Sequence, residues 1–266
     1  MKAQRRIQDI FARFGLEVRR KKAADALLFE QLVAARHLPE LLSNDGLTNA
    51  FLKFVVANRE QANGQLFQDL FVLFMLKEKR QGFFVEFGAT NGKHINNTYL
   101  LEKSYDWKGI LAEPARIWHE ALHKNRNCNI DTRCVWRNSG EEVIFNEVVS
   151  DPELSTINQF STGDHQAALR QDKNLYAVST ITLQELLQQY NAPKQIDYLS
   201  IDTEGTEYEI LKAFDFKAYD IQLITVEHNG TADQERIHTL LTANGFERVM
   251  AHITRWDDWY IKKGLR

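Results

Sequence analysis

The sequence predicts an α/β fold in which a seven-stranded mixed sheet carries helices on both faces and follows an N-terminal helical extension. From residue 83 onward, short apolar runs alternate with segments of helical periodicity, which is the pattern of parallel strands joined by helices. Several runs end abruptly in glycines or acids, as strands do at the ligand-binding edge of an open sheet. The last two runs, 246–253 and 259–262, are spaced to form a terminal hairpin.

Residues 1–80 are expected to form the helical extension, or cap, and residues 81–266 the α/β domain. Helical spacing of apolar residues recurs over 27–37, 47–58 and 66–79. Residues 1–22 hold eight basic and two acidic residues, a net charge of +6 (8 − 2), beside a helical apolar stripe. Such a helix either packs on its own domain with a solvated basic face or lies on an anionic membrane surface.

The first strand of the domain, expected over 83–87, runs into two glycines, Gly88 and Gly92. Glycine lacks a Cβ, so the backbone turns sharply there and lies close to a ligand. Glu86 and Ala89 belong to the same turn, and a helix is expected over 94–104. The spacing differs from the Gly-x-Gly-x-x-Gly of dinucleotide-binding folds, which disfavours a nicotinamide dehydrogenase.

The second strand, expected over 109–112, ends in Glu113 and Pro114, with a helix over 115–125 after it. Glu113 lies 21 residues past Gly92 (113 − 92), room for one helix and one strand. An acid at this point of a βαβ unit is placed to accept hydrogen bonds from ribose hydroxyls. The alternative is that Glu113 caps the following helix.

The third strand is expected over 130–135, and its end, Cys134-Val135-Trp136, is placed to flank a ligand's base or simply to pack at the edge. Residues 141–177 then form a long polar segment with a strand-like stretch at 143–145. Long polar loops inside compact domains are usually functional, so we expect either a lid over the site or a disordered insertion. A helix over 182–190 follows.

The fourth and fifth strands, expected over 196–201 and 221–227, both end in clusters of acidic and polar residues. Asp202, Glu204 and Glu207 cluster around a glycine after the fourth strand, before a helix over 206–214. Clustered acids repel one another, so a cation or a proton is expected among them. The fifth strand ends in Glu227-His228-Asn229, before a helix over 231–244.

Together these strand ends resemble the FkbM-type family of S-adenosylmethionine (SAM)-dependent methyltransferases. The resemblance covers roughly residues 65–260, and its specific part is Asp202-Thr203-Glu204-Gly205-Thr206-Glu207. It implies the class I SAM-methyltransferase (Rossmann-like) fold, SAM as cofactor, and O-methylation of a sugar, glycan, glycolipid or related small molecule. The cofactor-binding residues that the turns and the resemblance indicate are Glu86, Gly88, Ala89, Gly92, Glu113, Pro114, Val135 and Asp202.

Two versions of the chemistry follow for an alcohol acceptor, which needs help to lose its proton. In one, His228 or Glu204 takes the proton, beside Asp202 and Glu227. In the other, Asp202, Glu227 and Asn229 hold Mg²⁺ through oxygen ligands, by analogy with metal-dependent O-methyltransferases. A catalytically inactive protein that keeps the fold as a binding module remains the alternative function.

Charge and composition bound the partners and the compartment. Because the whole chain carries −3, residues 23–266 carry −9 (−3 − 6), which disfavours nucleic acid as a partner. There is no run of 18 apolar residues and no signal-peptide core, so a cytoplasmic enzyme is expected, membrane-peripheral if the basic helix binds lipid. Cys128 and Cys134 are expected to be reduced, and the oligomeric state stays open.

Overall fold

The computed structural model describes residues 46–265. The chain divides into two units, Met1–Ala50 and Phe51–Arg266, and the second holds the sheet. The helices expected within residues 1–22 and over 27–37 lie outside the described residues. The expected domain boundary at residue 80 stays a prediction. Among the described residues, none of the helices is long and apolar enough to cross a membrane.

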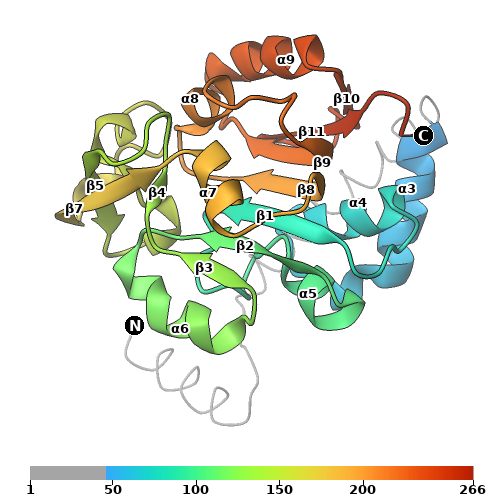
Figure 1. The fold of residues 1–266 in the computed structure, drawn as a ribbon, viewed down its shortest axis with the longest axis horizontal. Coiled ribbons are helices and arrows are strands. Elements are labelled where there is room, and N and C mark those ends of the chain that lie inside the picture. Colours follow the sequence, from blue (N-terminus) through green and yellow to red (C-terminus); the bar gives the residue numbers. More distant parts are fainter. Residues whose placement is uncertain (1–45, 266) are drawn as a thin grey trace, which may run out of the picture. The chain divides into compact units, whose positions relative to one another are not determined.

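A seven-stranded mixed sheet forms the centre of the second unit, as the sequence predicts (Figure 1). The strand order is β10-β11-β9-β8-β1-β2-β3. Five adjacent strands, β9, β8, β1, β2 and β3, run parallel to one another, whereas β11 runs antiparallel to its neighbours β9 and β10. The strands are β1 (Phe83–Phe87), β2 (Lys108–Ala112), β3 (Asn129–Asp131), β8 (Gln195–Ile201), β9 (Asp220–Glu227), β10 (Phe246–Val249) and β11 (Asp257–Lys262).

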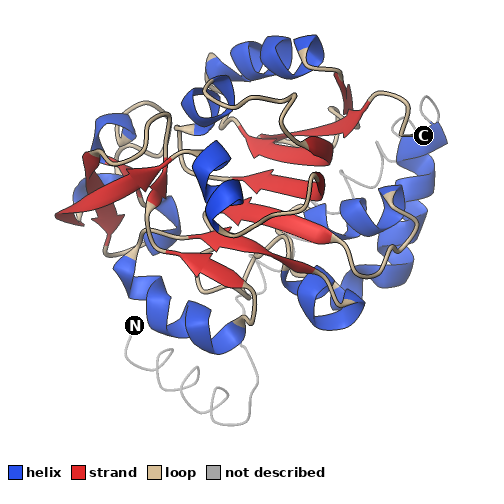
Figure 2. Ribbon diagram, in the orientation of Figure 1, coloured by secondary structure: helices blue, strands red, loops and turns tan. Residues whose placement is uncertain are grey.

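Helices lie over both faces of this sheet, so the residues of its central strands are buried on both sides (Figure 2). In β1, for example, Phe84, Val85 and Phe87 are all buried. The helices are α3 (Gly46–Asn58), α4 (Gln68–Met75), α5 (Tyr99–Tyr105), α6 (Arg116–Asn125), α7 (Leu183–Gln189), α8 (Glu207–Lys212) and α9 (Asp233–Ala243), and the 3₁₀ turns are η1 (Arg59–Gln61), η2 (Pro152–Leu154), η3 (Asn158–Phe160) and η4 (Leu169–Gln171).

Helix α4 packs directly against the antiparallel edge of the sheet. The rings of Phe71 and Trp259 lie 4.6 Å apart between centroids. Gln68 donates a hydrogen bond of 2.8 Å to the buried Asp257 at the start of β11. These contacts place the first residues of α4 close to the end of β9 and the start of β11. They therefore lie at the edge of the sheet where the acids gather.

A second, four-stranded sheet occupies most of the segment expected to be a polar loop. Its order is β4-β7-β5-β6, and it lies beside the carboxyl ends of the parallel strands (Figure 1). The expected third strand over 130–135 was therefore wrong as one element: Thr132 and Arg133 break it, β3 joins the large sheet, and the next two residues join the small one. The strands are β4 (Cys134–Val135), β5 (Glu142–Val148), β6 (Thr156–Ile157) and β7 (Lys173–Ile181).

Candidate active site

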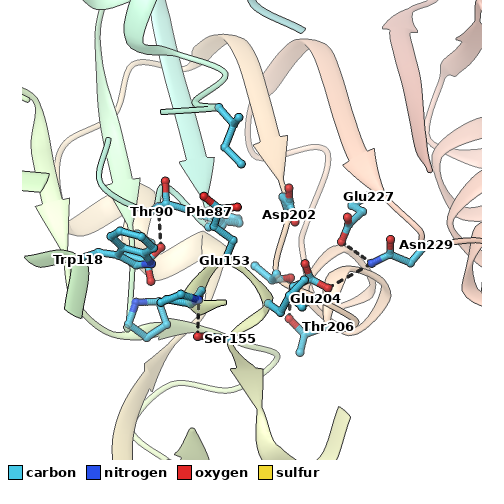
Figure 3. Close-up of a pocket in the computed structure, with 18 of the residues that line it drawn as sticks. Phe87, Thr90, Trp118, Glu153, Ser155, Asp202, Glu204, Thr206, Glu227 and Asn229 are labelled. Atoms are coloured by element: carbon cyan, nitrogen blue, oxygen red, sulfur yellow. Dashed lines mark hydrogen bonds between the residues drawn. The ribbon is translucent and has the colours of Figure 1, made fainter. Parts of the chain in front are cut away.

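A cavity of about 370 Å³ opens at the carboxyl ends of β1, β2, β8 and β9, between the large sheet and the insertion that carries β5 to β7. Ligand pockets in proteins commonly have volumes of about 300–1,000 Å³. Trp118 lies at one end of the cavity, and Asp202, Glu204, Glu227 and Asn229 lie at the other (Figure 3). The residues that line it include Gln65, Gln68, Phe87, Gly88, Thr90, Asn97, Glu113, Pro114, Trp118, Cys134, Val135, Phe145, Asp151, Glu153, Ser155, His165, Gln166, Asp202, Glu204, Thr206, Glu227, Asn229 and Trp256.

Gly88 brings two loops into contact at the floor of the cavity. Its φ is +75°, and a Cβ added there would lie 1.8 Å from the backbone oxygen of Asp202. Only glycine fits both this conformation and this approach. The close packing fixes the end of β1 against the end of β8, so the turn after β1 and the acids after β8 face one cavity.

Glu113 is held rigidly after β2. Its two carboxylate oxygens accept hydrogen bonds of 2.8 Å from the backbone N–H groups of Thr90 and Ala115. The side chain is buried, and burial raises the pKa of Glu113 to about 7. Glu113 thus stabilises the turn before α6 and also lines the cavity, where each oxygen keeps a lone pair for a further donor. Its contact with ribose hydroxyls stays a prediction.

The end of the cavity beyond Glu113 is apolar and partly aromatic. Trp118, Cys134, Val135 and Phe145 line it. Burial raises the pKa of the Cys134 thiol, which therefore stays neutral. Trp136 instead packs against Phe160, with 5.6 Å between ring centroids, and is not among the described residues lining the cavity.

Three carboxylates converge at the opposite end. One oxygen from each of Asp202, Glu204 and Glu227 lies within 4.8 Å of the others. Asn229 donates from Nδ2 to Glu227 at 2.8 Å and to Glu204 at 3.3 Å. Burial, together with repulsion among the acids, raises the pKa of Asp202 and of Glu227, and burial raises the pKa of Glu204 to about 7. The cluster therefore binds a proton readily or attracts a cation.

Arg170 ties the insertion to this cluster. The buried guanidinium donates to Glu204 at 2.6 Å, to both carboxylate oxygens of Asp164, and to the backbone oxygen of Leu154. Thr156 adds hydrogen bonds to the backbone oxygens of Thr203 and Glu204. The insertion is thus an ordered wall of the cavity, and sequence reasoning missed Arg170 because its partners are remote in the chain.

Three residues expected around the first turn lie behind the cavity rather than along it. The buried Glu86 accepts hydrogen bonds from Asn96, from the backbone N–H of Asn97 and from Thr98. Ala89 and Gly92 shape the same turn, and a Cβ on Gly92 would lie 2.6 Å from Leu122. These residues position Thr90 and Asn97, which do line the cavity.

His228 also points away from the cavity. Its Nδ1 accepts a hydrogen bond from the backbone N–H of Gly230, and its Nε2 faces Gln234 and lies 3.8 Å from Asp258. Burial lowers the pKa of His228. In this arrangement the ring is 6% exposed and is used for packing β9 against α9 and β11.

Several cavity residues carry no sequence signal that isolates them. Gln65 lies just before α4, Gln68 is its first residue, and Trp256 lies just before β11. Asp151, Glu153, His165 and Gln166 come from the insertion. Lone polar residues and single tryptophans are common in any sequence, and only the three-dimensional fold brings these together.

Comparison with known proteins decides the family. A family model described as the methyltransferase FkbM domain matches residues 86–258, a span that contains the small sheet, most of the large sheet and the acids that line the cavity. The chain belongs to this family. Its seven-stranded sheet is that of class I SAM methyltransferases, so the predicted family and fold class are confirmed.

Two solved structures show a distant likeness to this FkbM-family chain. Precorrin-6y C5,15-methyltransferase from Geobacter metallireducens GS-15 is 8% identical over 73% of this chain and 85% of that chain, with a TM-score of 0.38. A fibrillarin/Nop5p complex is 13% identical over 75% of this chain and 80% of that chain, with a TM-score of 0.37. No curated protein sequence matches the chain.

Proposed function

We propose that this methyltransferase transfers the methyl group of SAM to a hydroxyl of a sugar, a glycan or glycolipid, or a related small molecule. One observation carries the proposal: a single cavity joins the turns after β1 and β2, where a nucleoside fits, to three converging carboxylates, two of them buried, after β8 and β9. Open α/β sheets bind their ligands at this edge.

The cavity wall fits the groups of SAM. Glu113 has free lone pairs for ribose hydroxyls, and the apolar end around Trp118 suits adenine. Gly88, which lines the cavity beside Asp202, borders the space proposed for the methionine portion. The excess of acids suits a ligand that carries both an ammonium and a sulfonium charge.

The remaining chemistry falls to the residues at the acidic end. SAM supplies an electrophilic methyl carbon. As the acceptor oxygen forms its bond to that carbon, the carbon–sulfur electron pair leaves with sulfur, and the hydroxyl proton must go to a base. Glu204, with a pKa raised to about 7, is matched to this task, while Asp202 and Glu227 hold the hydroxyl in line.

Magnesium offers a different route for the same proton. Asp202, Glu204 and Glu227 present oxygen ligands at suitable mutual distances, but Asn229 directs its amide nitrogen, not its oxygen, at the two glutamates. The side-chain base is therefore the version that this arrangement favours. Titrations with and without Mg²⁺ test whether the site uses the metal instead.

Calorimetric titration with S-adenosylhomocysteine, the product of SAM, tests the proposal. We expect micromolar binding to the wild type and a loss of roughly tenfold or more in Glu113→Gln, since a charged acceptor is removed. Glu120→Gln, on the exposed side of α6, is the matched control and should bind normally. Titrations with and without Mg²⁺, repeated in Asp202→Ala, separate the two routes.

The wild-type titration also decides between enzyme and binding module. Failure of the folded wild type to bind S-adenosylhomocysteine would overturn the enzyme proposal and leave the inactive binding protein. Binding licenses a screen of sugar and glycolipid acceptors with radiolabelled SAM, in which transfer of label to any hydroxyl acceptor supports O-methylation.

A further inference from the structure

The wall of the cavity has a strongly one-sided charge. Six carboxylates line it: Glu113, Asp151, Glu153, Asp202, Glu204 and Glu227. No Lys or Arg is among the lining residues in the part of the chain that the structure describes, and His165 is the one histidine there. Bound SAM carries a net charge of only about +1, so the cavity stays acidic when the cofactor is in place. An acceptor with a phosphate, sulfate or carboxylate group would be repelled.

Two of these carboxylates belong to the insertion and lack partners. Asp151 and Glu153 flank Pro152 at the start of η2, and within residues 46–265 neither side chain has a hydrogen bond or an ion pair. Glu113, Glu204 and Glu227 differ, because each of them accepts hydrogen bonds from neighbouring protein groups. Asp151 is exposed and Glu153 is half-buried, so the pair stands at the mouth of the cavity.

The backbone that carries this pair is held in place. Ser155 donates to the Pro152 oxygen at 2.6 Å and accepts from the Val148 N–H at 3.0 Å. The buried Arg170 donates to the Leu154 oxygen at 2.8 Å. A carboxylate pair on a fixed backbone loses less entropy when it binds a ligand than a pair on a mobile loop.

The buried side of the cavity offers a further acceptor. Asn97 is 7% exposed, and its Oδ1 has no partner among the described residues. A buried polar atom left without a hydrogen bond costs free energy, so its presence on a cavity wall points to a ligand that donates one. Acceptors at the wall and carboxylates at the mouth together call for a ligand rich in N–H and O–H groups and positive in charge.

We propose that the acceptor carries an ammonium group near its reactive hydroxyl, as an amino sugar or another hydroxylated amine does, and that Asp151 and Glu153 bind this ammonium. The proposal rests on the O-methyltransferase function proposed above. Pairing with two carboxylates keeps the amine protonated, and an ammonium nitrogen has no lone pair with which to attack the methyl carbon. The same contact that recognises the acceptor therefore directs the methyl group to oxygen.

The test uses three matched hexoses and the full chain saturated with S-adenosylhomocysteine. Glucosamine and glucuronate each differ from neutral glucose at one substituent, an ammonium at C2 in the first and a carboxylate at C6 in the second. We expect glucosamine to bind roughly fivefold or more tightly than glucose, and glucuronate not to bind at millimolar concentration. In Asp151→Asn/Glu153→Gln the preference should fall to within about twofold, and in Glu142→Gln, an exposed control on β5, it should persist.

Each outcome bears on one proposal only. Equal binding of glucosamine and glucose, no binding of any of the three sugars, or a preference that survives in the double variant would overturn the ammonium site while S-adenosylhomocysteine still binds. Loss of S-adenosylhomocysteine binding itself would overturn the methyltransferase function instead.

Discussion

Two groups of buried acids lie at the carboxyl edge of the sheet, and they differ in how their charge is balanced. In the first, Glu86 and Glu102 surround the fully buried Arg126, whose guanidinium lies 3.9 Å from Glu86 and 2.6 Å from Glu102. The guanidinium also donates to the oxygens of Gly92, Asn96 and Thr98. Arg126 holds the pKa of Glu102 below its usual value although burial acts against it, whereas burial raises the pKa of Glu86 in spite of Arg126.

In the second group the acids outnumber the cations. Asp202, Glu204 and Glu227 converge beside the cavity, and Arg170 is the one arginine or lysine that pairs with them among the described residues. Burial raises the pKa of all three. Acids that are matched by a cation and hydrogen bonds build the fold, whereas acids left in excess at a cavity are available to a ligand or a proton.

The largest effect is expected from a substitution that disrupts the first group. Arg126→Met leaves the buried Glu86 without a cation and Glu102 with Lys103 alone, at 2.9 Å, so the free energy of unfolding should fall by about 3–5 kcal/mol. Urea denaturation followed by circular dichroism measures it. Arg80→Met removes an exposed pair with Asp106 and should cost less than about 1 kcal/mol. Equal losses in the two variants would contradict the assignment of Arg126 to the fold.

Asp202→Asn acts on the second group and should behave in the opposite way. We expect kcat/KM for methyl transfer to fall by at least about 100-fold, because a charge beside the reacting atoms is removed. The free energy of unfolding should stay the same or rise, since repulsion within the cluster is relieved. Asp233→Asn, on the half-buried start of α9, is the control for activity. A stable variant with full activity would remove Asp202 from the site.

Gly88 links the two groups, because it follows β1 and touches the loop of Asp202. Gly88→Ala tests this contact. The added Cβ would lie 1.8 Å from a backbone oxygen, and the expected loss of unfolding free energy is about 2–3 kcal/mol. Gly140→Ala has the same positive φ, +74°, with open space around it, and should cost only about 1 kcal/mol. The difference between the two melting temperatures isolates the contact from the backbone strain.

The sequence predicted the strands that carry the two groups and the three acids of the second group. The elements that it did not predict have physical explanations. Apolar runs mark parallel strands, so β1, β2, β8, β9 and the hairpin were predicted together with the acids that end them. The small sheet was not predicted as a unit: the sequence indicated a strand-like stretch at 143–145 within β5, but most of β7 is exposed or half-exposed, so no buried apolar run marks it. β5 and β7 pair residues that lie 25 (173 − 148) to 37 (179 − 142) positions apart in the chain, and no local pattern encodes such a pairing.

The direction of a side chain was the other limit. Glu86 is the acid of the first motif, yet the turn after β1 folds back on it, and Asn96, Asn97 and Thr98 take up its oxygens. Those partners lie ten or more residues away, beyond a loop whose path depends on Arg126. Motif spacing identifies which strand end is used, but the packing of the loop decides which side chain reaches the ligand.

Stability should respond to pH through the cavity acids. Burial raises the pKa of Glu113 and of Glu204 to about 7, above their values of about 4.5 in the unfolded chain. The folded protein therefore holds more protons than the unfolded chain between these values, and stability falls as pH rises through that window. We expect the ligand-free protein to lose roughly 1–2 kcal/mol of unfolding free energy between pH 6 and pH 8. Urea titrations at the two pH values measure it, and higher stability at pH 8 would contradict the shifts.

The smallest effect is expected at His228, where sequence and structure diverge most plainly. Along an extended chain successive side chains point to opposite sides, so Glu227, the last residue of β9, faces the cavity and His228 faces α9. Asn229 lies in the turn that follows, with a φ of +49°, and also lines the cavity. His228→Gln should therefore change kcat/KM by less than about threefold, whereas Glu204→Gln, which removes the matched base, should lower it by about 100-fold. Rates over pH 6–9 sharpen the comparison, because a base at His228 would leave its own ionisation in the wild-type profile and take it away in the variant. A 100-fold loss in His228→Gln with unchanged S-adenosylhomocysteine binding would move the proton transfer from the carboxylates to the imidazole.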